Sequence, residues 1–337
     1  MTAIEAQDGQ AVGVIGAGAW GTALAQMLAS DGREVLLWAR EEELVEAINV
    51  RRANPLFLPG AALAPSIRAT NDLRDAAACA VLLLVTPAQH LARIIGEIPA
   101  LPRDLVVCAK GIDAASGRMM HQVAGDAAPH SEIAVLSGPT FAHEVAAGLP
   151  TAVTLACTGG EAQWQRLAPV IARPAFRPYY STDVIGAEVG GAVKNVLAIA
   201  CGVVEGLELG QNARAALIAR GYAEMQRFGA ALGARLETLA GLCGLGDLVL
   251  TCTSTSSRNF SLGKALAQRA DPQALMSDRR TVAEGAHTAP VLAELAASHA
   301  IEMPIVAAVN RLLAGEPARA VAGDLLARPL TTEGARA

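Results

Sequence analysis

The stretch VGVIGAGAWGTALA, residues 12–25, decides the fold class. An apolar run that suits a buried strand is followed by Gly16-x-Gly18-x-x-Gly21 and then by residues with helical periodicity. In this setting Gly16 permits a tight turn, Gly18 lets the backbone approach a pyrophosphate, and Gly21 permits close packing of helix on strand. Unpaired N–H groups at the helix N-terminus would bind the anion. We predict a dinucleotide-binding turn, with an ordinary glycine-rich turn as the alternative.

Outward from this turn, the first half of the chain alternates short apolar strands with helical stretches. The strands are continuous apolar runs, rich in β-branched residues, of the kind that a parallel sheet buries on both faces. The expected strands are residues 11–16, 34–40, 81–85, 105–110 and 133–138, with further strands at 151–156 and 175–180. This order predicts an α/β, Rossmann-like, doubly wound sheet in the N-terminal part.

The second half changes character from Asp183 onward. Long alanine- and leucine-rich helical segments dominate, interrupted by glycine turns at 241–247 and polar residues at 256–259. We therefore predict an all-α C-terminal domain. The predicted divisions are a flexible N-terminus at 1–10, the dinucleotide-binding domain at 11–182, a helical substrate and catalytic domain at 183–330, and a disordered tail at 331–337.

Composition and charge limit the functional classes. The 337 residues are 52% hydrophobic and 18% charged, as in a globular protein with room for two domains. A net charge of −5 predicts no nucleic-acid partner. No uninterrupted apolar run is long enough to span a membrane, and MTAIEAQDGQ lacks the features of a signal peptide, so we expect a cytoplasmic protein without membrane insertion. Six scattered cysteines without a CxxC pair favour buried thiols and no metal site.

The end of the second expected strand bears on the choice of cofactor. An acid there would bond the ribose 2′-hydroxyl of NAD, whereas an arginine accommodates the 2′-phosphate of NADP. The chain has Arg40 at this point, followed by Glu41, with no acid before the arginine. We predict that NADPH is used at least as well as NADH. A surface arginine that caps the next helix is the alternative.

Polar groups follow several expected strands at the edge where such sheets bind ligands. Lys110 comes after LVVCA, Thr86 after VLLLV, and Ser137-Gly138-Pro139-Thr140 after IAVL. Each alone could be a structural turn. Together they favour a ligand site at the carboxyl edge of the sheet.

In the helical half, EVGGAVKNVLAIACGVV, residues 188–204, places Lys194 within a long apolar helix. The residues nearest to Lys194 in azimuth are all small, namely Ala187, Gly190, Ala198 and Cys201. A solvated face would carry several polar groups instead. We interpret the small residues as room for a ligand beside the ammonium group, with a solvent-facing lysine as the alternative.

Three further segments offer groups for an anionic ligand. Asp247 follows two glycines ahead of an apolar helix and could also be its N-cap. Ser257-Arg258-Asn259 combines a guanidinium with polar donors, which suits phosphate or a helix cap. Glu284 precedes a glycine ahead of another helix, whose dipole it could face. The histidines show no ligand or dyad spacing, and we interpret them as structural or surface groups.

Together these motifs resemble the bacterial NAD(P)-dependent glycerol-3-phosphate dehydrogenases over residues 11–328. The matching stretches are VIGAGAWGTALA, VLLWAR, AKGID, SGPTFAHEVAAGLPTAV, GLCGLGDLVLTCTSTSSRN, VAEG and the run from Gly191 to Gly221. The resemblance implies reversible reduction of dihydroxyacetone phosphate to sn-glycerol 3-phosphate with NADPH or NADH, supplying glycerophospholipid synthesis. It also implies, by analogy, a homodimer.

The resemblance further implies residue roles, with Lys194, Lys110 and Asp247 in catalysis. The implied cofactor-binding residues are Gly16, Gly18, Ala19, Trp20, Gly21, Arg40, Lys110, Gly138, Ala142, Arg258, Val282 and Glu284. The implied substrate-binding residues are Lys110, Gly138, Thr140, Lys194, Asn195, Asp247, Thr251, Ser257, Arg258 and Asn259. The family often has serine where Ala19 and Thr140 stand here, which could slightly alter contacts with the pyrophosphate.

Reduction of a ketone gives the central lysine a chemical purpose. Hydride addition makes an alkoxide, which needs a proton and a positive neighbour. A lysine supplies both if its surroundings lower its pKa from about 10.4 toward neutrality. An apolar helix and a second cation such as Lys110 would act in that direction, and Asp247 would oppose them.

Two other functions stay open from the sequence. A β-hydroxyacid dehydrogenase, acting on a carboxylate substrate, carries an asparagine four residues after its lysine, whereas here Asn195 is adjacent and position 198 is alanine. A non-catalytic NADP(H)-binding sensor on the same scaffold would be expected to lack Lys194 or Asp247.

Overall fold

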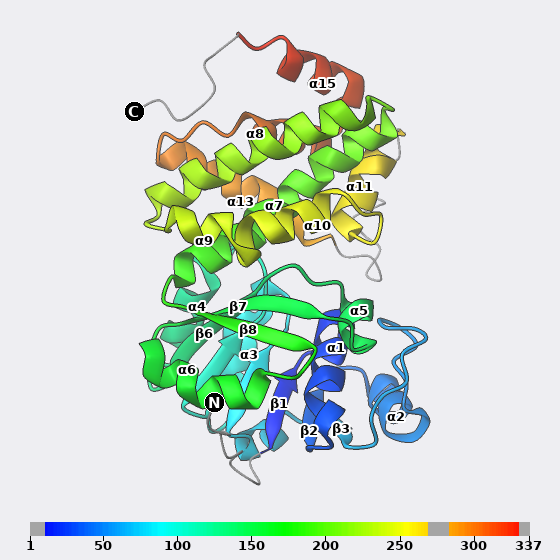
Figure 1. Ribbon diagram of the computed structural model, residues 1–337, viewed down its shortest axis with the longest axis vertical. Helices are drawn as coiled ribbons and strands as arrows, with labels where there is room; N and C mark the ends of the chain where they lie inside the picture. The colour runs from blue at the N-terminus through cyan, green and yellow to red at the C-terminus, as the bar shows by residue number, and fades with distance from the viewer. Residues whose placement is uncertain (1–10, 269–282, 330–337) are drawn as a thin grey trace. The chain divides into compact units, whose positions relative to one another are not determined.

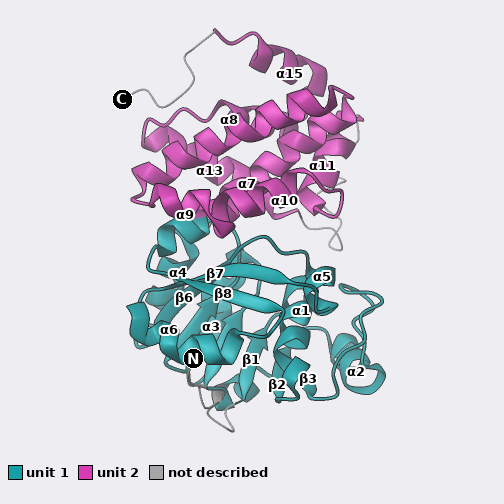
Figure 2. Ribbon diagram, in the orientation of Figure 1, with its two compact units in different colours: residues 1–113, 118–188 teal, residues 114–117, 189–337 magenta. Residues whose placement is uncertain are grey.

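The computed structural model describes residues 11–268 and 283–329 and divides them into two compact units (Figure 2). Unit 1 takes in residues 11–113 and 118–188, and unit 2 takes in 114–117 together with the described residues from 189 onward. The division falls inside helix α7 (Val184–Gly206), which begins in unit 1 and continues in unit 2. The domain boundary after residue 182 stays a prediction.

Unit 1 is built on one sheet of eight strands in the order β3-β2-β1-β4-β5-β6-β7-β8 (Figure 1). The strands are β1 (Val12–Ile15), β2 (Val35–Trp38), β3 (Ile67–Thr70), β4 (Val81–Leu84), β5 (Asp104–Val107), β6 (Glu132–Ser137), β7 (Thr151–Cys157) and β8 (Phe176–Ser181). Strand β1 pairs with β2 on one side and β4 on the other, so the chain winds in both directions from this point. This is the predicted doubly wound α/β fold, and its ligand crevice is expected where the strand order reverses.

Two features of the sheet differ from the expectation. Strand β3 was not predicted, because its four residues IRAT include the exposed Arg68 and form a short edge strand. Strand β7 runs antiparallel to β6, with Ala134 opposite Cys157, so the sheet is mixed rather than parallel throughout. The apolar run of β7 signals a strand with little exposure, but it carries no information about strand direction.

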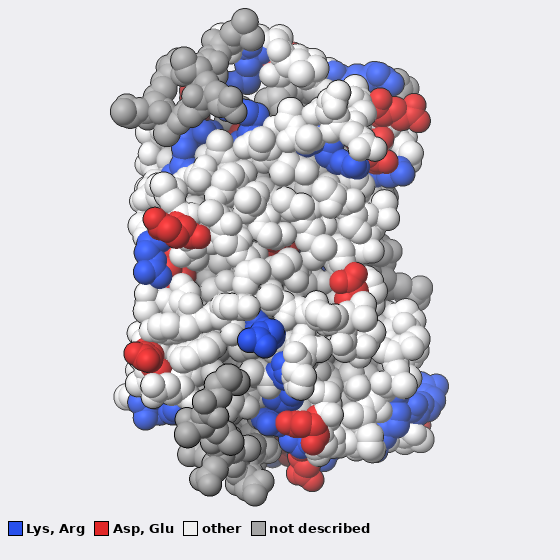
Figure 3. All heavy atoms as spheres, viewed as in Figure 1, with Lys and Arg blue, Asp and Glu red and all other residues white. Residues whose placement is uncertain are grey.

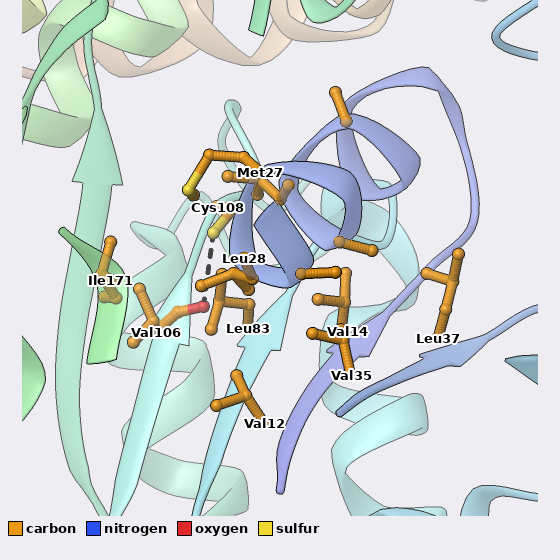
Figure 4. Packing of buried hydrophobic residues seen from close by; sticks show 14 of the residues in the cluster. Val12, Val14, Met27, Leu28, Val35, Leu37, Leu83, Val106, Cys108 and Ile171 are labelled. Atoms are coloured by element: carbon orange, nitrogen blue, oxygen red, sulfur yellow. Dashed lines mark hydrogen bonds between the residues drawn. The ribbon is translucent and has the colours of Figure 1, made fainter. Parts of the chain in front are cut away.

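Helices flank both faces of the sheet. In unit 1 they are α1 (Ala19–Leu28), α2 (Glu42–Arg51), α3 (Leu91–Glu97), α4 (Met120–Ala127), α5 (Ala142–Ala146) and α6 (Gly160–Ile171), with short 3-10 turns at Ala29–Asp31, Leu73–Ala78 and Ala88–His90. Side chains alternate between the faces of each strand. On one face Val14, Leu83 and Val106 pack with Met27 and Leu28 of α1 (Figure 4). Each fully buried side chain of this size stabilises the fold by about 1.5–3 kcal/mol, which holds the glycine turn before α1 in place.

Unit 2 is all helical within its described residues. Beyond α7 its helices are α8 (Gly210–Ala231), α9 (Leu236–Ala240), the π-helical turn η4 (Leu242–Gly246), α10 (Asp247–Cys252), α11 (Arg258–Ala267), α13 (Glu284–Ser298), α14 (Pro304–Leu313) and α15 (Ala318–Leu326). A Cβ on Gly202 would lie 2.0 Å from Phe260 O, and one on Gly263 would lie 1.9 Å from Ile199 O. Helices α7 and α11 therefore touch backbone to backbone.

Helix α7 is the core of unit 2. Among the described helices it alone is long and apolar enough to cross a membrane, but 94% of its most apolar window is buried inside the protein. Its apolar residues thus serve packing. All six cysteines of the chain are buried and free of disulfides, as predicted.

Charged side chains are scattered over the surface. On the face drawn in Figure 3, the described lysines, arginines and acids lie in small groups separated by wide uncharged areas. Arg311 contacts both Glu316 and Asp324 at 2.7 Å, which shows how opposite charges are brought together. Exposed pairs of this kind contribute only about 0–1 kcal/mol each to stability.

Candidate active site

Each of the three glycines of the first turn lies in a different structural environment, which explains why glycine suits that position. Gly16 has φ +121°, and a Cβ there would lie 2.9 Å from Val85 O on the neighbouring strand end. A Cβ on Gly21 would lie 1.8 Å from Gly16 O, so only glycine lets α1 approach the turn. Gly18 precedes the first residue of α1, and a Cβ there would meet no described atom within 4 Å. The helix N-terminus therefore opens onto space, as an anion site requires.

Three buried polar atoms at the carboxyl edge of the sheet lack a hydrogen-bond partner in the described part of the chain. They are Trp20 Nε1 after β1, Thr86 Oγ1 after β4 and Ser137 Oγ at the end of β6. A buried polar group without a partner costs about 1–3 kcal/mol. Donors and acceptors left at this edge fit a polar ligand such as a dinucleotide.

Three of the residues predicted for the site meet at the ends of β5 and β6. Lys110 Nζ donates to Gly138 O at 3.2 Å, and Thr140 Oγ1 donates to the same oxygen at 3.3 Å. The two strands are parallel neighbours, which brings their carboxyl ends together. A Cβ on Gly138 would lie 2.9 Å from Val153 Cα, so this position has no room for a side chain.

Three other residues of unit 1 were predicted to bind the cofactor. Ala19 is the first residue of α1 and Ala142 the first of α5, and both pack against the core, so each can offer only its backbone and a methyl group. Arg40 has a side chain that is 69% exposed and donates from Nε and Nη2 to Glu41 Oε1, at 3.1 and 2.7 Å. The guanidinium that was predicted to contact the 2′-phosphate thus forms an ion pair with a carboxylate.

In unit 2, Lys194 lies in a buried network with two side chains of α10. Its Nζ donates to Asp247 Oδ1 at 2.5 Å and to Thr251 Oγ1 at 3.0 Å, while Thr251 Oγ1 lies 3.2 Å from Asp247 Oδ1. Lys194 and Thr251 are each 5% exposed and Asp247 is fully buried. Asp247 is the first residue of α10, yet its side chain pairs with the lysine rather than capping the helix.

The interpretation of the small residues around Lys194 as room for a ligand is wrong. Ala187, Ala198 and Cys201 are fully buried by protein. A Cβ on Gly190 would lie 2.2 Å from Cys243 O, so the glycine admits the backbone of η4. That close approach places α10, which follows η4 directly, with Asp247 against the lysine.

The Ser257–Asn259 segment starts α11. Ser257 is its N-cap, and its Oγ accepts the Phe260 N–H at 3.3 Å, so the cap interpretation is confirmed for this residue. Arg258 is exposed at the first helical position, and Asn259 is buried and bonded to Asn195. Glu284 is the first residue of α13, whereas Val282 lies outside the described residues.

One buried acid in unit 1 was missed from the sequence. Glu188 accepts the backbone N–H of His121 at 2.7 Å, and its other oxygen lies 2.5 Å from His121 Nδ1. Burial raises the pKa of the Glu188 carboxyl, and the contact with His121 opposes this. The two residues are far apart in the chain. Glu188 opens the stretch quoted around Lys194, but nothing in the sequence joins it to His121.

Comparison with known proteins agrees with this geometry. The family described as the NAD-dependent glycerol-3-phosphate dehydrogenase N-terminus matches residues 11–163, and the corresponding C-terminus matches residues 183–322. A glycerol-3-phosphate dehydrogenase (NAD(P)+) of Novosphingobium aromaticivorans is 72% identical over 96% of this chain and 98% of its own, and that of Erythrobacter litoralis is 69% identical over 96% and 97%. The crystal structure of glycerol-3-phosphate dehydrogenase from Coxiella burnetii is 38% identical, with a TM-score of 0.89 over 95% of this chain and 99% of its own. The chain belongs to the NAD-dependent glycerol-3-phosphate dehydrogenase family.

Proposed function

We propose that this protein reduces dihydroxyacetone phosphate reversibly to sn-glycerol 3-phosphate with a nicotinamide cofactor. The observation that carries the proposal is the buried Lys194–Asp247–Thr251 network. A buried ion pair is expensive to maintain for stability alone, and apolar residues of similar size would serve the fold as well. Its presence in a chain of this family favours a chemical role.

The cofactor residues of unit 1 fit a dinucleotide. The open N-terminus of α1 suits the pyrophosphate, and the unpaired Thr86 and Ser137 hydroxyls suit polar groups beside it. The chemistry that a reduced nicotinamide supplies when bound is a hydride for a carbonyl carbon. The proton donor and the groups that bind the substrate must then be side chains of this protein.

Lys194 is the proposed proton donor in the reducing direction and the acceptor in reverse. The carbonyl oxygen that receives a pair of electrons needs a proton and a nearby positive charge, and an ammonium supplies both. Hydrogen bonds to Asp247 and Thr251 fix the direction of the amine. Lys110, which Gly138 O orients at 3.2 Å, is proposed as a second cation for the substrate.

The start of α11 is proposed to hold the substrate phosphate. Helix N-termini bind anions through backbone N–H groups and the helix dipole. Ser257 adds a hydroxyl whose proton remains available while its oxygen caps the helix, and the exposed Arg258 adds a guanidinium. Binding energy from this remote group would orient the carbonyl for reaction.

The finer properties follow from the same residues and from analogy. We propose that NADPH is used at least as well as NADH, because Arg40 can accommodate a 2′-phosphate. Its pairing with Glu41 argues for a modest rather than strict preference. A cytoplasmic homodimer that supplies glycerophospholipid synthesis is proposed by analogy, and sedimentation of the purified protein would test the dimer.

Oxidation of NADPH with dihydroxyacetone phosphate tests the proposal, with wild type beside Lys194→Ala and each assay repeated with NADH. We expect turnover by the wild type and a loss of at least about 100-fold in the variant. Folded wild-type protein that binds NADPH but turns over neither cofactor would refute the proposal and redirect the search to carboxylate substrates or a sensor.

A further inference from the structure

One buried asparagine joins the glycine turn of unit 1 to a segment well separated from it in the chain. Asn54 follows helix α2, stands 37 residues after Ala17 and is fully buried. Its Nδ2 donates to Ala17 O at 2.9 Å and to Thr22 Oγ1 at 2.8 Å. Its Oδ1 accepts the Phe57 N–H at 2.9 Å. Both ends of this amide are therefore bonded to the protein itself.

The Phe57 N–H determines which end of the amide faces the glycine turn. The oxygen and nitrogen ends of an amide have nearly the same shape, and their assignment rests on their hydrogen-bond partners. A backbone N–H can only donate, so it must face Asn54 Oδ1. The NH2 group then faces the turn, where Ala17 O and Thr22 Oγ1 accept its two hydrogens. The Thr22 hydroxyl has an oxygen lone pair for this bond because its own proton is donated to Ala17 O at 3.2 Å.

These bonds fix the plane of the peptide group between Ala17 and Gly18. Ala17 O accepts two hydrogen bonds, one from Asn54 and one from Thr22. In a trans peptide the N–H points away from the C=O, and the described chain has no cis peptide bond. The Gly18 N–H is therefore directed away from Asn54, and no group in the described part of the chain accepts it. An anion beside the start of α1 can accept this N–H.

We infer that Asn54 is a positioning residue for the cofactor, which holds the Ala17–Gly18 peptide so that the Gly18 N–H meets the pyrophosphate. Asn54 cannot act by contact, because its side chain is buried and both ends of its amide are bonded to protein. Glycine has the widest choice of backbone angles, so the peptide before Gly18 needs such an anchor. An N–H that is already oriented raises the affinity, since binding does not have to order it. The inference rests on the proposed function, in which this turn binds a dinucleotide.

The substitution Asn54→Leu tests the inference, because leucine has nearly the same shape as asparagine but no hydrogen-bonding group. We expect the Kd for NADPH, measured by calorimetry on folded protein, to rise by roughly 10- to 100-fold, as when one hydrogen bond to a charged group is lost. Adenosine 2′-monophosphate lacks the pyrophosphate. Its Kd should change by less than about 2-fold, because contacts at separate sites contribute independently.

Asn49→Leu is the matched control in the same unit. Asn49 of α2 also uses both ends of its amide, since its Nδ2 donates to Ala69 O at 2.9 Å and its Oδ1 accepts the Ala69 N–H at 2.8 Å. The variant loses comparable bonds away from the glycine turn, so both Kd values should stay close to those of the wild type. If Asn54→Leu does not fold, Thr22→Val and Thr22→Ser take its place. Valine removes the hydroxyl that donates to Ala17 O and serine keeps it, so only Thr22→Val should weaken NADPH binding.

Two results would overturn the inference. One is a Kd for NADPH that is the same in the wild type and in Asn54→Leu or Thr22→Val. The other is an equal loss of affinity for NADPH and adenosine 2′-monophosphate, which would show a general disturbance of unit 1. A wild type that binds NADPH but does not turn over dihydroxyacetone phosphate would refute the proposed function alone, because the Kd comparison needs no substrate. A wild type that binds no NADPH would refute both.

Discussion

Glu224 allows a quantitative test of the energetics of unit 2. This residue of α8 is 1% exposed and accepts the N–H groups of Ile305 at 2.7 Å and Val306 at 3.3 Å. Pro304, the first residue of α14, has no N–H, so Glu224 caps the next two positions. Burial raises the pKa of Glu224 from 4.5 to about 7, although the two backbone N–H groups and, more weakly, Arg227 and Arg328 oppose this.

The sign of the pH dependence follows from the raised pKa. Between pH 4.5 and about 7 the folded state holds the proton that the unfolded state has released. The cost of ionising the buried carboxyl is therefore absent below this window, grows as pH rises through it and is complete above it. The full cost is about 3 kcal/mol, of which about 2.5 kcal/mol falls between pH 5 and pH 8.

The substitution Glu224→Gln removes the charge and keeps an oxygen for the Ile305 N–H. It places an NH2 group where the second carboxylate oxygen accepted the Val306 N–H, and that loss is the same at every pH. We expect the free energy of unfolding of the variant, relative to wild type, to rise by about 2.5 kcal/mol from pH 5 to pH 8. Urea unfolding is followed by two signals. The far-ultraviolet circular dichroism reports on the helices of both units, whereas the three tryptophans, Trp20, Trp38 and Trp164, all lie in unit 1, so that fluorescence reports on unit 1 alone and a transition seen only by circular dichroism belongs to unit 2.

Glu294→Gln, an exposed change in the same unit, is the control and should show no such difference. A Glu224→Gln variant whose relative stability is the same at both pH values would refute the reasoning, because the buried carboxyl would then cost nothing to ionise. A relative stability that falls with pH would show that its bonds to α14 outweigh burial.

Three further predictions concern single contacts. Thr251→Val removes a hydrogen-bond acceptor of Lys194, so kcat/KM for dihydroxyacetone phosphate should fall about 10-fold. The exposed Thr253→Val is the control and should have little effect. Equal kinetics for the two variants would count against a role for the network. Glu41→Gln removes the carboxylate paired with Arg40, so the Kd for NADPH should decrease by roughly 2- to 5-fold while the Kd for NADH stays the same. Glu42→Gln is the control. Equal decreases for both cofactors would exclude a contact between Arg40 and the 2′-phosphate. His121→Ala keeps the backbone N–H that Glu188 accepts but removes its side-chain partner, so the stability of unit 1, followed by tryptophan fluorescence, should fall by about 1–3 kcal/mol. The exposed His130→Ala should have little effect, and similar losses in both variants would contradict a structural role for the pair.

Local patterns sufficed for much of the fold. The glycine spacing at residues 16–21 and the alternation of apolar strands with helices predicted the doubly wound sheet, because a short-range period records which residues are buried. The direction of β7 could not be predicted in this way, since an apolar run reads the same whichever way its neighbour runs. The predicted site residues Lys110, Gly138 and Thr140 do lie together, because parallel neighbouring strands bring their carboxyl ends to one edge of the sheet.

The sequence by itself determined the fold class, the glycine turn and the presence of a lysine in an apolar helix, because these depend on neighbours in the chain. Only the tertiary structure decided what surrounds that lysine. The small stripe beside Lys194 was consistent with a ligand or with close packing, and Gly190 turned out to admit η4. The partners Asp247 and Thr251, and the bond from Asn54 to the glycine turn, come from segments far along the chain. Hydrophobic pattern specifies that a surface is covered, whereas three-dimensional packing specifies which groups cover it.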